Sequence, residues 1–434
     1  MRELPPSQTA APWGTGLRPI GRRDALRALG LGLGTAALAA LAGCEATQST
    51  QGKPSASTAS GTPAGEFDWA GWWSEQQQTG IVDFANWPYY IDRQRDNSHP
   101  SLELFTKQTG IDVNYYRPVR GNAEFLEQAR PGMEAGTPEW DLVVVTNGPQ
   151  LSTWMENGWF TPLDHDQLPN FQQHAGPLVQ GPAWDPENRY TIAWQSGFTG
   201  IGFRPEAVEA LGREPRSVWD LWNPALKGRV GMMSDLLELG SLGLLAIGVD
   251  PPSSSLAEWK EAAAVLERQH QEVSPRYYDQ GYLNALGRGD VWISMAWSGD
   301  IFQLNQLGHP ELRFVMPDEG AMFWTDNMAI PLGAAHPADA IALMDFVYRP
   351  PVAAMIADWV WYVSPVPAAK PIIAQRLDDP VVAHSPLVFP ELDTAQGGAS
   401  PGEEGLGRLR DYYVFERAED YSPWRDLFSP IAFS

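Results

Sequence analysis

This sequence of 434 residues contains one cysteine, Cys44, and seven histidines that are scattered along the chain. A single cysteine cannot form an intramolecular disulfide, and it cannot supply the paired thiolates of a structural zinc site. None of the histidines stands in the H-x-H or H-E-x-x-H spacing of metal-binding sites. The sequence therefore predicts no metal site and no thiol chemistry.

Motifs of common catalytic and nucleotide-binding sites are also absent from the sequence. It has no G-x-S-x-G elbow, no G-x-x-x-x-G-K phosphate loop and no Rossmann fingerprint. The glycine-rich run at residues 197–202 has its glycines in a different order from a phosphate loop, and it is better interpreted as a place where the chain crosses between lobes. We therefore expect no bound cofactor and no catalytic residue.

The longest uncharged run, residues 28–43, lies near the N-terminus, shortly after Arg22 and Arg23. Its length suits the core of a signal peptide better than a membrane span, and paired arginines before such a core are typical of twin-arginine export signals. The run ends at Leu41-Ala42-Gly43-Cys44, which resembles the lipobox of bacterial lipoproteins. Residues 1–43 are therefore predicted to be a signal peptide, and Cys44 the lipidation site. The alternative is a secretory signal followed by a buried core cysteine.

Residues 44–66 follow as a stretch of mostly Ser, Thr, Ala, Gly, Gln and Pro. This composition buries too little apolar surface to fold, so it predicts a flexible, lipid-anchored linker. No other apolar run reaches 18 residues, and no further membrane span is expected. The predicted location is the outer face of the cytoplasmic membrane, to which the N-terminal lipid anchors the protein.

Acidic side chains far outnumber basic ones. The whole chain carries 30 basic and 53 acidic residues, and residues 44–434 carry 25 and 51, a net charge of −26. A surface of this sign repels nucleic acid and anionic lipid, and it favours cationic partners. On charge alone, a generally acidic soluble surface is an equally good interpretation.

Helical and extended patterns alternate along the chain, which predicts α/β lobes. Strands are expected at residues 80–86, 111–116, 141–145, 190–203, 229–233, 291–297, 314–316 and 328–331. Helices are expected at residues 102–109, 151–158, 218–226, 256–270 and 338–348. Residues 393–405 are expected to be a loop.

Carboxylates beside tryptophans are the strongest indication of a binding site. The chain has nineteen tryptophans, and Asp300 and Asp326 lie within three residues of Trp297 and Trp324 respectively. Aromatic faces attract ammonium groups through cation–π contacts, and carboxylates accept charge-assisted hydrogen bonds from them. A flexible aliphatic polyamine needs both kinds of wall.

Asp235 and Glu238 stand three residues apart, directly after an expected strand, where a helix should begin. Residues with this spacing share one helix face, so both could meet an amine. An ordinary helix-capping box is the competing interpretation. Three tyrosine pairs, at residues 115–116, 277–278 and 412–413, could in principle bind ferric iron, but packing is the favoured role.

Several motifs in a fixed order resemble the spermidine/putrescine-binding components of ABC importers, over about residues 80–370. They are Phe84-x-Asn86-Trp87-x-x-Tyr90, FTKQTGI at residues 105–111, WDLVV at 140–144, SVWDLW at 217–222, Lys227-Gly228, and PDEGAMFWTDNMAIP at 317–331.

The resemblance implies a two-lobed α/β fold like that of type II periplasmic binding proteins, with a ligand cleft between the lobes and two crossing strands. It places residues 67–198 and 324–368 in the N-lobe, and residues 199–323 and 369–434 in the C-lobe. Carried over by position, the ligand-binding residues are Trp87, Tyr90, Thr146, Asp235, Glu238, Trp297, Asp300, Trp324, Asp326 and Tyr362.

Two positions depart from the family pattern. Pro88 replaces a usual Ser or Thr, and Gly148 stands where spermidine binders have a tyrosine. The implied partners are a polyamine ligand and the permease subunits of an ABC transporter, with no nucleic acid, and a monomer is expected. Two alternatives remain: a binding protein for another small ligand, such as a cationic amino acid derivative, a sugar or ferric iron, or a secreted glycoside hydrolase that uses Asp300 and Asp326.

Overall fold

The computed structural model describes residues 67–94, 96–306, 308–390, 392–393, 398–399, 409–412, 415 and 418–433. The chain divides into two units, residues 1–52 and 53–434, and every described residue belongs to the second. The predicted signal peptide, the lipidation site Cys44 and the predicted linker lie outside the described residues.

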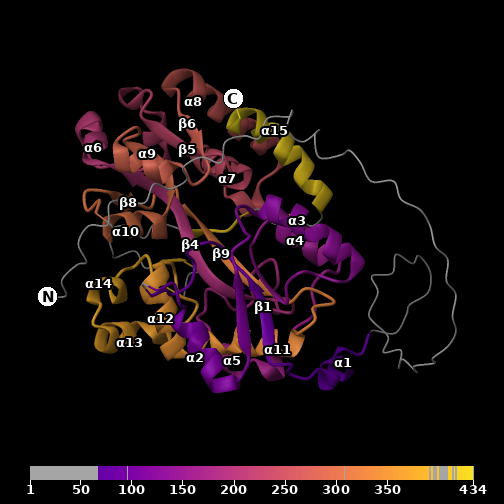
Figure 1. Cartoon of the computed structure of the whole chain (residues 1–434). Coiled ribbons are helices and arrows are strands. Elements are labelled where there is room, and N and C mark those ends of the chain that lie inside the picture. The colour runs from indigo at the N-terminus through magenta and orange to yellow at the C-terminus, as the bar shows by residue number, and fades with distance from the viewer. Residues whose placement is uncertain are drawn as a thin grey trace, which may run out of the picture. The chain divides into compact units, whose positions relative to one another are not determined.

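One ten-stranded mixed sheet forms the centre of the described part of the chain (Figure 1). Strand β8 (Arg313–Val315) adds to β4, and β12 (Leu409–Arg410) adds to β9. The other strands follow the order β2 (Asp112–Tyr116), β1 (Ile81–Ala85), β3 (Leu142–Thr146), β9 (Ala321–Ala329), β4 (Thr191–Phe203), β7 (Ile293–Trp297), β5 (Val230–Met233) and β6 (Arg276–Tyr278).

The sheet consists of two parallel parts joined by a long antiparallel pair. Strands β2, β1 and β3 run parallel to one another, as do β7, β5 and β6. Between them β9 and β4 pair antiparallel, and β4 then continues beside β7. All thirteen residues of β4 are buried. The two long strands therefore carry the chain from one parallel part of the sheet to the other.

Strand β9 corrects one expectation. The strand predicted at residues 314–316 is observed as β8. The short strand predicted at residues 328–331 overlaps only the end of β9, a nine-residue strand that runs through the Trp324 region with every residue buried. The polar residues Thr325, Asp326 and Asn327 obscured the pattern. Their backbone groups pair with β3 on one side and β4 on the other, and this pairing, rather than local hydrophobicity, makes the segment a strand.

Helices cover both parts of the sheet (Figure 1). Beside β1, β2 and β3 in sequence are α1 (Trp69–Glu75), α2 (Pro100–Thr109), α3 (Asn122–Ala135), α4 (Pro149–Glu156) and α5 (Pro169–His174), with α11 (Pro337–Phe346) and α12 (Pro350–Val360) returning later in the chain. The other part carries α6 (Pro205–Leu211), α7 (Leu236–Ala246), α8 (Leu256–Val273), α9 (Tyr282–Arg288) and α10 (Ser298–Gln306), and the chain ends in α13 (Lys370–Ile372), α14 (Pro380–Ala383) and α15 (Ser422–Ala432).

The helix expected at residues 218–226 is two short 3₁₀ turns, η2 (Val218–Trp222) and η3 (Pro224–Leu226). Pro224 has no backbone N–H, so it cannot continue a helix, and the Asn223 side chain instead accepts a hydrogen bond from the Ala225 amide. Part of the loop expected at residues 393–405 takes part in a two-residue ladder between β10 (Leu392–Asp393) and β11 (Gly398–Ala399).

The α/β class is confirmed, and most of the expected strands and helices lie within a few residues of their observed bounds. Among the described residues, no single helix combines the length and hydropathy needed to cross a membrane. Helices α11 and α12 have the required length and hydropathy only when taken together, and the pair is bent by 79°.

Candidate functional site

The predicted site residues come from the ends of strands that the sheet brings together. Thr146 and Trp297 are the last residues of β3 and β7, Trp87 and Tyr90 follow β1, and Glu238 follows β5. Because β3 and β7 run in opposite directions, their carboxyl ends face each other along β4, level with Gln195 and Thr199 respectively. Ligands of α/β proteins commonly bind at the carboxyl ends of strands. Strand β9 passes between these facing ends and supplies Trp324 and Asp326, whereas Asp300 comes from α10.

Four aromatic rings form a continuous cluster between these facing strand ends. The Tyr90 and Tyr362 rings meet edge to face at 5.4 Å, and Tyr362 lies 5.4 Å from Trp324. Trp324 in turn lies 6.3 Å from Trp297. Tyr90 and Trp297 come from opposite parts of the sheet, so the cluster joins the two parts. It offers the aromatic faces that a cation would contact.

The β4 strand positions Tyr90 through an irregularity. The register between β4 and β9 shifts between Ala193 and Gln195, opposite Asn327 and Asp326. The residue at this bulge, Trp194, donates a hydrogen bond from Nε1 to the Tyr90 carbonyl at 3.1 Å. Bulges of this kind re-aim side chains near functional sites.

Asp326 lies on β9 and is almost fully buried, with 5% of its surface exposed. The Thr146 hydroxyl donates a hydrogen bond to its Oδ1 at 2.6 Å. Burial raises the pKa of Asp326 to about 6, against the lowering effect of this hydrogen bond. Burial and the nearby charge of Asp326 raise the pKa of Tyr90. The Tyr90 hydroxyl has no aligned hydrogen-bond partner among the described residues.

Asp300 lies in the first turn of α10 and is held between two tyrosines. Tyr362 donates to its Oδ1 and Tyr282 to its Oδ2, both at 2.7 Å. The Tyr282 hydroxyl also accepts a hydrogen bond from the Trp297 amide at 3.0 Å. Burial raises the pKa of Asp300, and the two hydroxyl donors oppose that shift. The carboxylate is therefore fixed in orientation by rigid phenol groups.

Glu238 is the third acidic group of the cluster and is 5% exposed. Its Oε1 accepts hydrogen bonds from the Thr199 hydroxyl at 2.6 Å and from Trp297 Nε1 at 3.0 Å. Its Oε2 is buried and has no hydrogen-bond partner among the described residues. Burial, with the nearby charge of Asp235, raises the pKa of Glu238 to about 7.

The side chain of Asp235 makes different contacts from that of Glu238. Its side chain is exposed and caps α7, accepting hydrogen bonds from the amides of Leu237 at 2.9 Å and Glu238 at 3.0 Å. The capping interpretation is therefore confirmed for Asp235. It does not extend to Glu238, whose side chain turns toward Thr199 and Trp297 instead of back to the cap.

Two glycines leave room for the aromatic cluster. A Cβ at Gly197 would lie 2.4 Å from the Trp324 ring, and a Cβ at Gly299 would lie 2.6 Å from the Tyr362 ring. Neither ring could stay in place against a side chain at that distance. Gly197 belongs to the glycine-rich run at residues 197–202 that was predicted to serve a chain crossing, and it does lie in the crossing strand β4.

Trp87 is the predicted residue with the weakest link to the cluster. It is half-buried and packs against the core, and its Nε1 is buried with no hydrogen-bond partner among the described residues. Its ring makes none of the aromatic contacts described above. Gly148, one of the two departures from the family pattern, has a φ of 144° and lies against Leu237 of α7, so it marks a close approach between the two parts of the sheet.

Sequence reasoning missed two residues that hold the site together. Tyr282 orients Asp300, and Thr199 links Glu238 to Trp324, whose Nε1 donates to the Thr199 hydroxyl at 3.2 Å. Neither residue stands beside an acid or a tryptophan in the sequence. No local pattern marks them, because their partners lie from 15 to 125 residues away.

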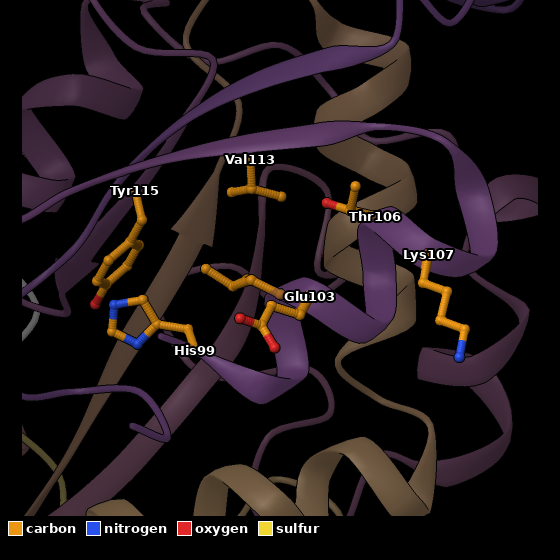
Figure 2. A pocket seen from close by; sticks show the side chains of 7 residues that line it. His99, Glu103, Thr106, Lys107, Val113 and Tyr115 are labelled. Atoms are coloured by element: carbon orange, nitrogen blue, oxygen red, sulfur yellow. The ribbon is translucent and has the colours of Figure 1, made fainter. Parts of the chain in front are cut away.

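A separate surface pocket of about 390 Å³ lies on α2 and β2 (Figure 2). None of the ten predicted ligand-binding residues lines it. His99 and Tyr115 flank one end of the pocket and Lys107 lies at the other. The described part of the chain also contains no group of three His, Cys, Asp or Glu side chains that could hold a metal ion.

In this structure two long strands cross between two α/β parts, and aromatic and acidic side chains meet at the crossing. This arrangement defines the class of two-lobed solute-binding proteins. Residues 138–395 match the family of bacterial extracellular solute-binding proteins, and the chain belongs to this family. Its members bind solutes and are not enzymes. The glycoside hydrolase alternative is therefore rejected.

Curated relatives carry polyamine names. The chain is 29% identical to the spermidine/putrescine-binding periplasmic protein of Escherichia coli (strain K12) over 336 residues, which is 76% of this chain and 89% of that protein. It is 28% identical to the putrescine-binding periplasmic protein PotF of the same strain over 323 residues, covering 71% and 82% respectively.

Solved structures support the fold. A putative spermidine/putrescine ABC transporter protein from Listeria monocytogenes superposes with a TM-score of 0.67 at 22% identity, over 82% of this chain and 99% of that one. PotD from Streptococcus pneumoniae gives a TM-score of 0.66, also at 22% identity, over 81% and 98%. The predicted type II periplasmic-binding-protein fold is confirmed.

Proposed function

We propose that this protein is a lipid-anchored solute-binding protein of an ABC importer that captures polyamines such as putrescine and spermidine and delivers them to a membrane permease. The names of its curated relatives support this ligand class. The ten predicted site residues are its proposed ligand contacts, with Trp87 and Asp235 contributing from the margins of the cluster.

The observation that carries the proposal is a set of carboxylates without cations. Asp326 and Glu238 are buried and Asp300 is half-buried, yet none of the ion pairs among the described residues includes any of the three. A buried carboxylate is costly unless a cation pairs with it. Protonated amines of a ligand supply that cation, and the surrounding rings cover its methylenes.

The strand register indicates an elongated site. Asp326 pairs with Gln195, whereas Thr199, which donates to Glu238, pairs with Met322. Four strand residues separate the two levels, which corresponds to about 13 Å. Carboxylates at two ends, with Tyr362 and Trp324 between them, suit a linear molecule that carries an amine at each end.

Delivery requires two lobes that close on the ligand, since closure would create the surface that a permease recognises. We propose an N-lobe around β1, β2 and β3 and a C-lobe around β5, β6 and β7, joined by β4 and β9. The packing of α15 on α7 and α8 supports placing the end of the chain in the C-lobe. Because α13 and the turn at Ile373–Leu377 pack on α12, and α14 packs on that turn, we propose that the second N-lobe segment ends at residue 383 instead of residue 368.

Isothermal titration calorimetry with putrescine, spermidine and spermine tests the ligand class. We expect at least one of the three to bind with a dissociation constant in the micromolar range or below, with 1:1 stoichiometry. Sugars and neutral amino acids serve as controls and should release no heat of binding. A folded sample that binds none of the three polyamines would exclude the proposal.

Lipid anchoring is proposed from the sequence, because Cys44 ends the apolar run at a lipobox-like motif. A linker of about 22 residues would span roughly 25 Å as a random coil, which leaves the binding domain free to reorient beside a permease. In cells that express the full chain, we expect the protein in the membrane fraction with an acylated N-terminal cysteine, and Cys44→Ser in the soluble fraction. An unmodified Cys44 in the mature wild type would contradict the anchor.

A further inference from the structure

The end of the chain packs against the candidate site although it lies outside the family match, which stops at residue 395. We call residues 409–412, 415 and 418–433 the C-terminal segment. Its strand β12 pairs in parallel with β9, with Leu409 opposite Ala321 and Arg410 opposite Met322. Its short turn η7 (Ala418–Tyr421) contacts α4, and α15 packs on α7 and α8 (Figure 1). The segment thus contacts both parts of the molecule.

Aromatic side chains anchor the C-terminal segment firmly to the helix that carries Glu238. Trp424 is fully buried, and its Nε1 donates a hydrogen bond to the Leu236 carbonyl at 2.8 Å. A Cβ at Gly240 of α7 would lie 2.2 Å from the Trp424 ring, so the helix has a glycine where the tryptophan packs. Phe415 packs 5.9 Å from Trp424 and 6.1 Å from Trp259 of α8.

This anchoring places Tyr412 at the acidic cluster. Tyr412 lies between β12 and Phe415 in the chain and is 4% exposed. Its hydroxyl lies within hydrogen-bonding reach of Glu238 and Thr199. Burial and the Glu238 charge raise the pKa of Tyr412, so the phenol remains a protonated donor at neutral pH. Glu238 Oε2 is buried and has no hydrogen-bond partner among the described residues, so one oxygen of this acid lacks a donor that an ammonium group would supply.

We propose that Tyr412 is a specificity-determining residue: its ring closes the Glu238 end of the binding site and limits the length of the polyamine that the site accepts. The inference rests on the proposed polyamine function. β12 lies level with Met322 and Thr199, four residues along β9 from Asp326, which lies level with Thr146. A ligand that places one amine at Asp326 and extends toward Glu238 therefore meets the Tyr412 ring next.

The test compares three polyamines on one set of variants by calorimetry. For each variant the dissociation constant of putrescine is divided by that of spermine. Tyr412→Ala opens the end of the site, so we expect this ratio to rise threefold or more over the wild type. Tyr412→Phe keeps the ring and should leave the ratio within threefold. Spermidine should fall between the other two ligands.

A matched control separates ligand contact from packing of the C-terminal segment. Tyr421 belongs to the same segment and packs its ring 5.1 Å from Phe415. Tyr421→Ala should leave the putrescine-to-spermine ratio within threefold, even if every affinity falls. Should Tyr412→Ala fail to fold, Tyr412→Leu shortens the side chain while keeping an apolar group, and the same criterion applies.

The outcomes are distinguishable. A wild type that binds no polyamine overturns the proposed function and this inference with it. A wild type that binds polyamines, with a ratio that changes less than threefold in Tyr412→Ala, overturns only the role of Tyr412. An equal rise of the ratio in Tyr421→Ala also overturns it, because loosening of the segment would then suffice.

Discussion

The variant Asp326→Asn should lose at least about 100-fold in polyamine affinity, because removing one partner of a buried charge pair costs about 2–5 kcal/mol. Asp326 is buried, and no cation pairs with it among the described ion pairs. The neutral amide keeps the shape of the side chain but cannot balance an ammonium group. Calorimetry with the tightest-binding polyamine measures the loss directly.

The same substitution should leave the unliganded protein nearly as stable as the wild type, or slightly more stable. The charged form of Asp326 is disfavoured by burial, which is why its pKa rises to about 6. The control is Asp318→Asn, which removes a carboxylate from an exposed ion pair with Arg216 and should change neither affinity nor stability by much. A large fall in melting temperature in Asp326→Asn would show that this carboxylate is structural.

Polyamine affinity should fall steeply on acidification. Burial raises the pKa of Glu238 to about 7 and that of Asp326 to about 6, so both carboxylates take up protons between pH 7.5 and 5. A cationic ligand needs them ionised, and each protonated group weakens binding by up to about tenfold per pH unit. Titrations at pH 7.5 and 5.0 should differ on the order of 100-fold or more. A constant affinity across this range would contradict a role for both acids.

Stability of the unliganded protein should follow the opposite trend. For a carboxyl group whose pKa is higher in the folded than in the unfolded state, the stabilising contribution is complete below the unfolded value and is lost as pH rises through the folded value. Asp326 and Glu238 therefore favour folding near pH 4 and oppose it by pH 7–8. The variant Glu238→Gln should flatten the upper part of this dependence in thermal melts taken without ligand.

Most of the strands, and the acids beside tryptophans, could be recognised from short stretches of the sequence. The buried run of β3 is apolar throughout, as parallel strands require, and Asp326 stands two residues from Trp324. The strand that carries Asp326 could not be recognised in the same way. Its polar residues disguise it, and only pairing with β3 and β4 makes it extended.

The sequence by itself determined the α/β class, the predicted export and lipidation signal at Cys44, and the identity of the acids and aromatic rings, because each depends on residues close together in the chain. Only the tertiary structure decided which groups meet. Tyr282 reaches Asp300, Thr199 reaches Glu238, and Tyr412 reaches both Glu238 and Thr199 across long stretches of chain. Such contacts follow from how the strand ends of the two parts face each other along β4 and β9, and no local pattern of residue types encodes that convergence.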